Sequence, residues 1–291
     1  LIPMITRFLA SFCLSSSFLL ADQGDGHVLS QKTWGPPVGM SLKLESKSSM
    51  LNGEIIAVTS GNWSTGTSRY LGGQLLTAKW IDGNNLEVDF EKRRGTYRRF
   101  LNDQRTNEIQ TSPLEGTVLR LTKDGKNWSA EVVKGKKEDV DETRLEREMK
   151  EVEASMESDY SLNLFGEQAR KVGETWKVKN PRLPWFNDEK VLSGEATVTF
   201  GKLVKVNGDP SAVLDYSVTV RSERPGDQKI LVDFKGKGQV IRSLKHLVDY
   251  ELSGLGSIDM TVETGEGSYV ETTGKYQLVR KIELSPIEEK K

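Results

Sequence analysis

The sequence predicts a mainly β protein, either one antiparallel curved sheet or half-barrel(s), with one prominent central helix at about residues 139–157. Three observations carry this prediction. Short runs of branched and aromatic residues alternate with polar ones at period two, Gly-containing turn pairs separate these runs, and one segment alone has helical periodicity.

The alternating runs are typical of half-buried strands, because successive side chains of a strand point to opposite faces. They cover residues 54–60, 86–90, 117–122, 196–200, 212–220 and 229–234. Between them stand Asn52-Gly53, Asp82-Gly83, Asp124-Gly125, Asn207-Gly208 and Pro225-Gly226-Asp227. Asn-Gly and Asp-Gly tolerate the positive φ of tight turns, so these pairs favour successive antiparallel hairpins.

The helical segment, residues 136–158, contains no Gly or Pro and is rich in helix formers. Its apolar residues follow one narrow stripe and comprise Leu145, Met149, Val152 and Met156. Asp139 or Asp141 can cap its start. We expect the helix to lie on the sheet; a coiled-coil partner is the alternative, although the stripe is short for one. Residues 160–170 predict a second short helical or irregular stretch.

The predicted organisation has five parts. A signal peptide (1–21) precedes an N-terminal antiparallel β region (22–135), a helical segment (136–170), a C-terminal antiparallel β region (171–285) and a charged tail (286–291). The two β regions can be separate domains, or residues 22–285 can form one continuous domain. The length of the chain allows either arrangement.

The N-terminal stretch predicts export to the periplasm or the extracellular space. Arg7 precedes a short apolar run over residues 8–20, and Ala21 suits the end of a cleaved signal peptide. The run is shorter than the roughly 20 residues that span a bilayer, and no later segment has 18 consecutive apolar residues. Cys13 leaves a lipoprotein signal as an alternative. A buried terminal helix is another.

Composition argues against several classes of function. With 41 basic and 42 acidic residues, the chain has no overall charge that attracts nucleic acid. The two histidines, His27 and His246, are far apart, and Cys13 is the only cysteine. We therefore predict no catalytic residues, no metal site and no cofactor, and we expect His246 to be a structural residue at the rim of the core.

Two stretches are candidate binding surfaces. Residues 91–100 interleave cations with aromatic residues, and Arg93, Arg94, Arg98 and Arg99 are the candidates for binding lipid phosphates or an anionic glycan. Trp185 and Phe186 lie in a Pro-rich stretch, where an exposed aromatic pair can bind a sugar or lipid. A solvated hairpin rim and aromatics folded onto the core are the respective structural alternatives.

Four segments carry a resemblance to known proteins. They are Val172-Gly-Glu-Thr-Trp-Lys-Val178, Gly194-Glu-Ala-Thr-Val-Thr-Phe200, Val204-Lys-Val-Asn-Gly-Asp209 and Lys237-Gly-Gln-Val-Ile241. Over about residues 160–285 the chain resembles uncharacterised secreted bacterial β-rich proteins, whose motifs are turns, a buried Trp and a hairpin. The overall pattern is also similar to periplasmic lipoprotein-carrier half-barrels, a likeness that implies a concave apolar face for acyl chains.

These observations lead to three functional hypotheses. The first is an exported, non-catalytic envelope protein that binds an apolar or amphipathic ligand, or a protein partner, in the hollow of a curved sheet. For this ligand the candidates are Leu145, Met149, Val152, Met156, Trp185 and Phe186, and the expected partners are lipid, glycan or an envelope protein. The second is a carboxylate-dependent hydrolase acting on glycans. The third is a structural or assembly module without a small ligand.

Overall fold

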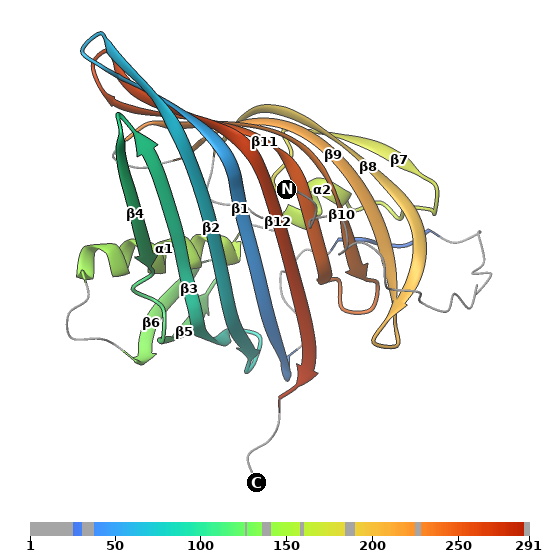
Figure 1. Ribbon diagram of the computed structural model, residues 1–291. Helices are drawn as coiled ribbons and strands as arrows, with labels where there is room; N and C mark the ends of the chain where they lie inside the picture. The colour runs from blue at the N-terminus through green and yellow to red at the C-terminus, as the bar shows by residue number, and fades with distance from the viewer. Residues whose placement is uncertain are drawn as a thin grey trace, which may run out of the picture.

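The computed structural model describes residues 26–30, 38–125, 127–135, 141–157, 160–183, 190–224 and 228–287. Within them, twelve strands form one open antiparallel sheet in the order β6-β5-β3-β2-β1-β12-β11-β10-β9-β8-β7, and β4 also pairs with β3 (Figure 1). The strands are β1 (Met40–Thr59), β2 (Asn62–Trp80), β3 (Asn85–Leu101), β4 (Gln104–Thr111), β5 (Val118–Asp124), β6 (Asn127–Lys134), β7 (Thr175–Lys179), β8 (Lys190–Val206), β9 (Asp209–Arg224), β10 (Ile230–Ser243), β11 (Asp249–Gly265) and β12 (Ser268–Pro286).

The first and last strands, β1 and β12, join the two β regions into this single sheet. Their antiparallel ladder runs from Met40 opposite Pro286 to Val58 opposite Tyr269. The prediction of a mainly β antiparallel protein is confirmed. The sheet is open and does not close into a barrel, and strands β1–β6 and β7–β12 are its two halves.

Both helices lie on the same concave side of the sheet, which we call the inner face (Figure 1). The central helix α1 (Glu142–Glu157) is shorter than expected, and residues 136–140 lie outside the described part. Its start is capped as predicted, since the Asp141 carboxylate accepts a hydrogen bond from the Arg144 N–H at 3.1 Å. The second helix is α2 (Tyr160–Phe165). Neither described helix is long and apolar enough to cross a membrane.

Each helix covers its own apolar core on the inner face. In the half that carries α1, Leu145 and Met156 pack with strand residues such as Leu86, Phe90 and Leu119. In the half that carries α2, Leu164 and Phe165 pack with Trp176, whose indole N–H donates to the Leu164 carbonyl at 2.8 Å. Two separate cores therefore lie side by side under one sheet.

The predicted turn pairs are of two kinds. Asn207 and Gly208 have φ values of 52° and 86° and connect β8 to β9, as expected for a tight hairpin. Asn52-Gly53 is not a turn. It lies within β1, where the pairing register shifts between Leu51 and Glu54 and Asn52 has φ 54°. A β-bulge can use the same positive φ as a turn, so this dipeptide predicted the conformation correctly and the connection wrongly.

Candidate functional site

The inner face changes from apolar to polar between the two cores. On β1 the inner positions run from Leu42 and Leu44 to Ser46 and Ser48, and on β2 the partner of Ser46 is Gln74. Here the structure has a hollow of about 680 Å³, which we call the inner hollow. Its lining residues are Ser46, Ser48, Tyr70, Gly73, Gln74, Arg93, Arg94, Gly95, Gln110, Ser112, Arg144, Arg147, Glu148, Glu151, Arg224, Gln228 and Ile230. The volume is within the usual range for a small-molecule site.

Helix α1 supplies one wall of the inner hollow. The residues involved are Arg144, Arg147, Glu148 and Glu151, which are spaced i, i+3, i+4 and i+7 and so form a single stripe. This charged stripe lies beside the apolar stripe that packs into the core. One face of α1 therefore packs into the core, and the adjacent face lines the inner hollow.

Glu148 is the centre of the ion pairs in this wall. It is buried, and its carboxylate lies 3.3 Å from Arg144 and 3.8 Å from Arg93 while also accepting a hydrogen bond from the Ser112 hydroxyl. Arg93 additionally lies 3.8 Å from Glu151, and its guanidinium is 5.6 Å from the centre of the Phe90 ring. These contacts hold Arg93 and Arg144 in place before any ligand arrives.

A second glutamate fixes the edge of the hollow. Glu115 accepts hydrogen bonds from the Arg93 N–H at 2.9 Å and from the Arg94 Nε at 3.0 Å. The hydrogen bond to Glu115, together with its charge, raises the pKa of Arg94. This carboxylate occupies the stretch of the β3 edge between β4 and β5, where the ladder leaves a strand N–H to be satisfied.

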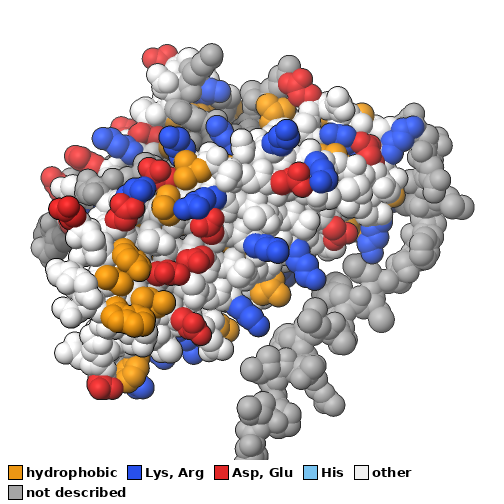
Figure 2. Space-filling view, turned by 90° about the horizontal axis from the view of Figure 1, so that it is seen from above, with side chains coloured by type: hydrophobic (Ala, Val, Ile, Leu, Met, Phe, Trp, Pro, Cys, Tyr) orange, Lys and Arg blue, Asp and Glu red, His pale blue; other side chains and the backbone are white. Residues whose placement is uncertain are grey.

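Positive charge exceeds negative charge around the inner hollow. Among the residues that the structure describes, five arginines and two glutamates line it, and Glu115 adds one further carboxylate close by. By contrast, cationic and anionic side chains are interspersed over the surface seen in Figure 2. Guanidinium groups present planar pairs of donors that match carboxylate and phosphate oxygens. The arrangement is therefore suited to an anionic ligand.

The four arginines predicted from the sequence do not form one patch. Arg93 and Arg94 line the inner hollow, whereas Arg98 donates to the Asn107 side chain at 3.1 Å and Arg99 lies 3.3 Å from Glu108. By alternation along β3, Arg93 and Arg99 share the inner face, whereas Arg94 borders the hollow at its edge, where it bonds to Glu115. The spacing in sequence could not show which of them a ligand would meet together.

The apolar residues predicted to bind a ligand belong to the core or lie outside the described residues. Leu145 and Met156 are buried, and Met149 and Val152 are partly buried against the same core. Trp185 and Phe186 lie outside the described residues. A ligand-binding role for these six residues stays a prediction, and the structure gives the four on α1 a packing role.

The two histidines take part in local structural contacts. The His27 N–H donates to the Arg170 carbonyl at 2.8 Å, and the His27 ring lies against Phe200 with 5.9 Å between ring centroids. His246 Nε2 lies 3.2 Å from Asp209, which also accepts a hydrogen bond from the Tyr250 hydroxyl at 2.7 Å. That hydrogen bond is the main cause of the lowered pKa of Asp209.

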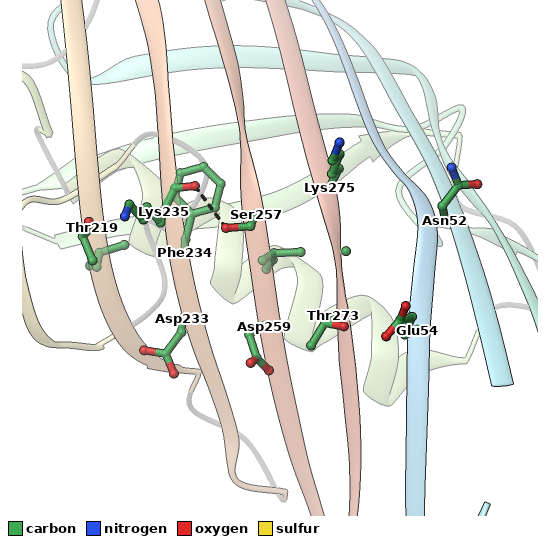
Figure 3. A pocket seen from close by; sticks show the side chains of 13 residues that line it. Asn52, Glu54, Thr219, Asp233, Phe234, Lys235, Ser257, Asp259, Thr273 and Lys275 are labelled. Carbon is green, nitrogen blue, oxygen red and sulfur yellow. Dashed lines mark hydrogen bonds between the residues drawn. The ribbon is translucent and has the colours of Figure 1, made fainter. Parts of the chain in front are cut away.

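A second pocket, of about 460 Å³, lies on the opposite, outer face across β9, β10, β11, β12 and β1 (Figure 3). Asp233, Asp259, Thr273 and Glu54 follow one another across four neighbouring strands in register. Lys235, Ser257 and Lys275 form the adjacent row (Figure 3). We call this feature the outer pocket; its charges are arranged in rows of opposite sign.

Asp233 and Asp259 in the outer pocket are directly opposed on neighbouring strands. Partial burial, with the charge of Asp233 as a smaller cause, raises the pKa of Asp259. Asp233 forms a long ion pair with Arg221, with 3.9 Å between the carboxylate oxygen and the guanidinium nitrogen. The hydrolase hypothesis needs two carboxylates that face each other across a cleft, whereas these two are side-by-side neighbours on one face of the sheet, and that hypothesis stays a prediction. Among the described residues, no group of three or more His, Cys, Asp or Glu is placed to hold a metal ion.

Comparison with known proteins defines no family. No family model matches the chain, and no curated protein matches it in sequence. The sequence-level resemblance over residues 160–285 therefore has no support from these comparisons.

Similar solved structures are distant. A lipovitellin structure, described as concerning lipid-protein interactions, has 8% identity and a TM-score of 0.42 over 88% of this chain, which spans only 26% of that chain. A β-barrel-like protein of a domain of unknown function from Brucella abortus has 10% identity and a TM-score of 0.18, covering 87% of this chain and 100% of its own. A putative outer membrane lipoprotein-sorting protein domain from Vibrio parahaemolyticus has 9% identity and a TM-score of 0.14, covering 84% and 87%.

These neighbours include a lipoprotein-sorting domain, as the fold-level similarity anticipated. With TM-scores below 0.5, none of them carries an argument about ligand or activity. The geometry of this chain alone therefore bears on its function. It defines an open β-sheet protein with an arginine-lined hollow on its inner face.

Several residues of the inner hollow were missed in the sequence. Tyr70, Gln74, Arg147 and Arg224 come from three different elements, and no local pattern relates them. One signal was available, because Ser46 and Ser48 interrupt a series of inward positions that is apolar at Leu42 and Leu44. Such an interruption marks the place where a sheet stops facing a core.

Proposed function

We propose that this chain is an exported, non-catalytic binding protein that holds an anionic ligand in the inner hollow. The observation that supports this most is the excess of arginine over glutamate in a hollow of about 680 Å³ between two filled cores. Residues 1–21 support export, because their pattern is that of a cleaved signal peptide.

The hollow fits this role because several of its cations are already oriented. Glu148 and Glu151 hold Arg93 and Arg144, so a ligand would not have to order these long side chains. Arg147 projects from the same wall of α1 into the hollow's lining. A preorganised set of guanidinium groups raises affinity for an anion by lowering the entropy cost of binding.

The proposal can be tested with inorganic pyrophosphate as a probe, by isothermal titration calorimetry on the full chain. We expect Arg147→Gln to weaken binding at least roughly tenfold, because each charge-assisted contact contributes about 1.5–3 kcal/mol. The matched control is Arg221→Gln on the outer face, where the affinity should change less than about twofold. Equal losses in both variants, or an absence of binding to the unmodified protein, would contradict the proposal.

A further inference from the structure

The inner hollow contains an aromatic residue in an unusual position. Tyr70 lies on β2, and the residues on the same face at the neighbouring positions are Gly72 on β2 and Gly95 on β3, which are register partners. A Cβ placed on Gly72 would overlap the Tyr70 hydroxyl, and one on Gly95 would lie 3.0 Å from its Cε2 atom. The ring of Tyr70 therefore occupies the space above both glycines, lying along the sheet.

Aromatic rings cover glycines elsewhere in this sheet, but inside the core. Phe234 covers Gly236 and Gly256 in this way, and Phe234 is buried. Tyr70 differs because it is only partly buried and lines the hollow. The ring lies over the backbone of the two glycines, and the part of Tyr70 that is not buried borders the hollow.

The polar character of the lining limits what can lie on this ring. Beside the charged residues, the hollow is lined by hydroxyl and amide side chains, including Ser46, Ser48, Gln74, Gln110 and Gln228, with Ile230 as its aliphatic side chain. The cavity inside the α2 core, which is lined by residues such as Leu164, Leu214 and Val240, measures about 10 Å³ and has no room for an acyl chain. A lipid tail would have to lie against hydroxyl, amide and guanidinium groups and would leave them without partners.

We propose that the ligand of the inner hollow is a sugar that carries an anionic group, and that its ring stacks on Tyr70. This inference rests on the proposed function. An aromatic face accepts the apolar face of a sugar ring, the amides and hydroxyls bond to its hydroxyl groups, and the guanidinium groups bind its phosphate or carboxylate. An anionic sugar is a different class of ligand from the apolar or amphipathic molecule that the sequence predicted.

Calorimetric titration with four probes tests the proposal. Glucose 6-phosphate and trigalacturonate represent a phosphorylated sugar and an acidic glycan, inorganic phosphate is the anion without a ring, and lysophosphatidic acid is the anionic lipid. We expect at least one sugar to bind roughly tenfold more tightly than phosphate, because stacking adds to the ionic contact. Whichever sugar binds tells whether the source is a sugar phosphate or a uronic acid polymer.

Two variants isolate the contribution of the ring. Tyr70→Phe keeps the aromatic face and should change sugar affinity less than about threefold, whereas Tyr70→Leu covers the glycines without it and should weaken sugar binding roughly tenfold. Pyrophosphate affinity should change by less than about threefold in both variants, so a loss that is large only for the sugar identifies the ring as a contact of the sugar. Tight binding of the lipid but not the sugars, or equal sugar binding by Tyr70→Leu, would overturn this inference while leaving the proposed anion site standing. If the unmodified protein did not bind pyrophosphate, both the proposed anion site and the sugar inference would be overturned.

Discussion

The two halves of the sheet are covered by helices of different character. Four of the six residues of α2 are buried, and they are Tyr160, Ser161, Leu164 and Phe165. The longer α1 buries one stripe and turns a neighbouring stripe of charged residues toward the inner hollow. Helix α2 consequently only closes a core, whereas α1 closes a core and also forms a wall of the hollow between the two halves.

Buried charge is also used differently in the two halves. In the α2 half, Arg242 and Asp249 form an ion pair at 2.6 Å with side chains only 3% and 2% exposed, and the guanidinium lies 5.1 Å from the Phe165 ring centre. In the α1 half the arginines share glutamates at 3.3–3.8 Å at the wall of an open hollow. An arginine that is fully buried with one carboxylate stabilises a closed core, whereas arginines that remain partly exposed to water and share carboxylates can line a binding site.

The largest expected effect concerns the closed half. Arg242→Met removes the guanidinium and leaves the buried Asp249 carboxylate without this counter-charge, so we expect a loss of about 3–5 kcal/mol in the free energy of unfolding. Urea denaturation followed by circular dichroism measures it. The control is Arg221→Met, whose ion pair with Asp233 is about half exposed and should contribute less than about 1 kcal/mol. A similar loss in both variants would mean that the α2 half is not closed as described.

The second prediction separates the two stripes of α1. Leu145→Ala should lower the free energy of unfolding by about 2–3 kcal/mol, the lower part of the range for buried leucines, because the neighbouring hollow lets the site relax. Arg147→Ala, two residues further along α1 and on the side that faces the hollow, should change it by less than about 0.5 kcal/mol. Chemical denaturation of both variants measures the difference. If Arg147→Ala cost as much as Leu145→Ala, the charged stripe would be structural rather than part of a site.

Much of the fold could be predicted from the sequence, because strands and helices leave local patterns in it. Period-two alternation and the i, i+4, i+7 spacing of Leu145, Met149 and Val152 are local patterns, and the sheet and the helix that they predicted are present. Asn52-Gly53 shows the limit, because a turn and a bulge need the same local backbone. Local sequence specifies a conformation but not whether the chain reverses there.

The candidate site was harder to predict, because it depends on pairing between distant segments. Arg93 was singled out for its neighbours in sequence, Arg94, Arg98 and Arg99, yet its partners in the structure are Glu148 and Glu151 of α1. Tyr70 meets Gly95 only through the register of β2 with β3. Such register is determined by the whole sheet, so a reading of separate runs could not bring these residues together.

The smallest expected effect lies on the outer face of the α2 half, which neither helix covers. Partial burial and the opposing Asp233 raise the pKa of Asp259, so the ionised form costs stability. This cost is absent below the ordinary carboxyl pKa and complete above the raised one. Asp259→Asn should therefore raise the melting temperature by about 1–3 °C at pH 7 and leave it unchanged below about pH 3, as differential scanning calorimetry would show. A loss of stability at pH 7 would mean that Asp259 makes a favourable contact in its ionised form, and the outer face would then resemble the ion-paired wall of the inner hollow.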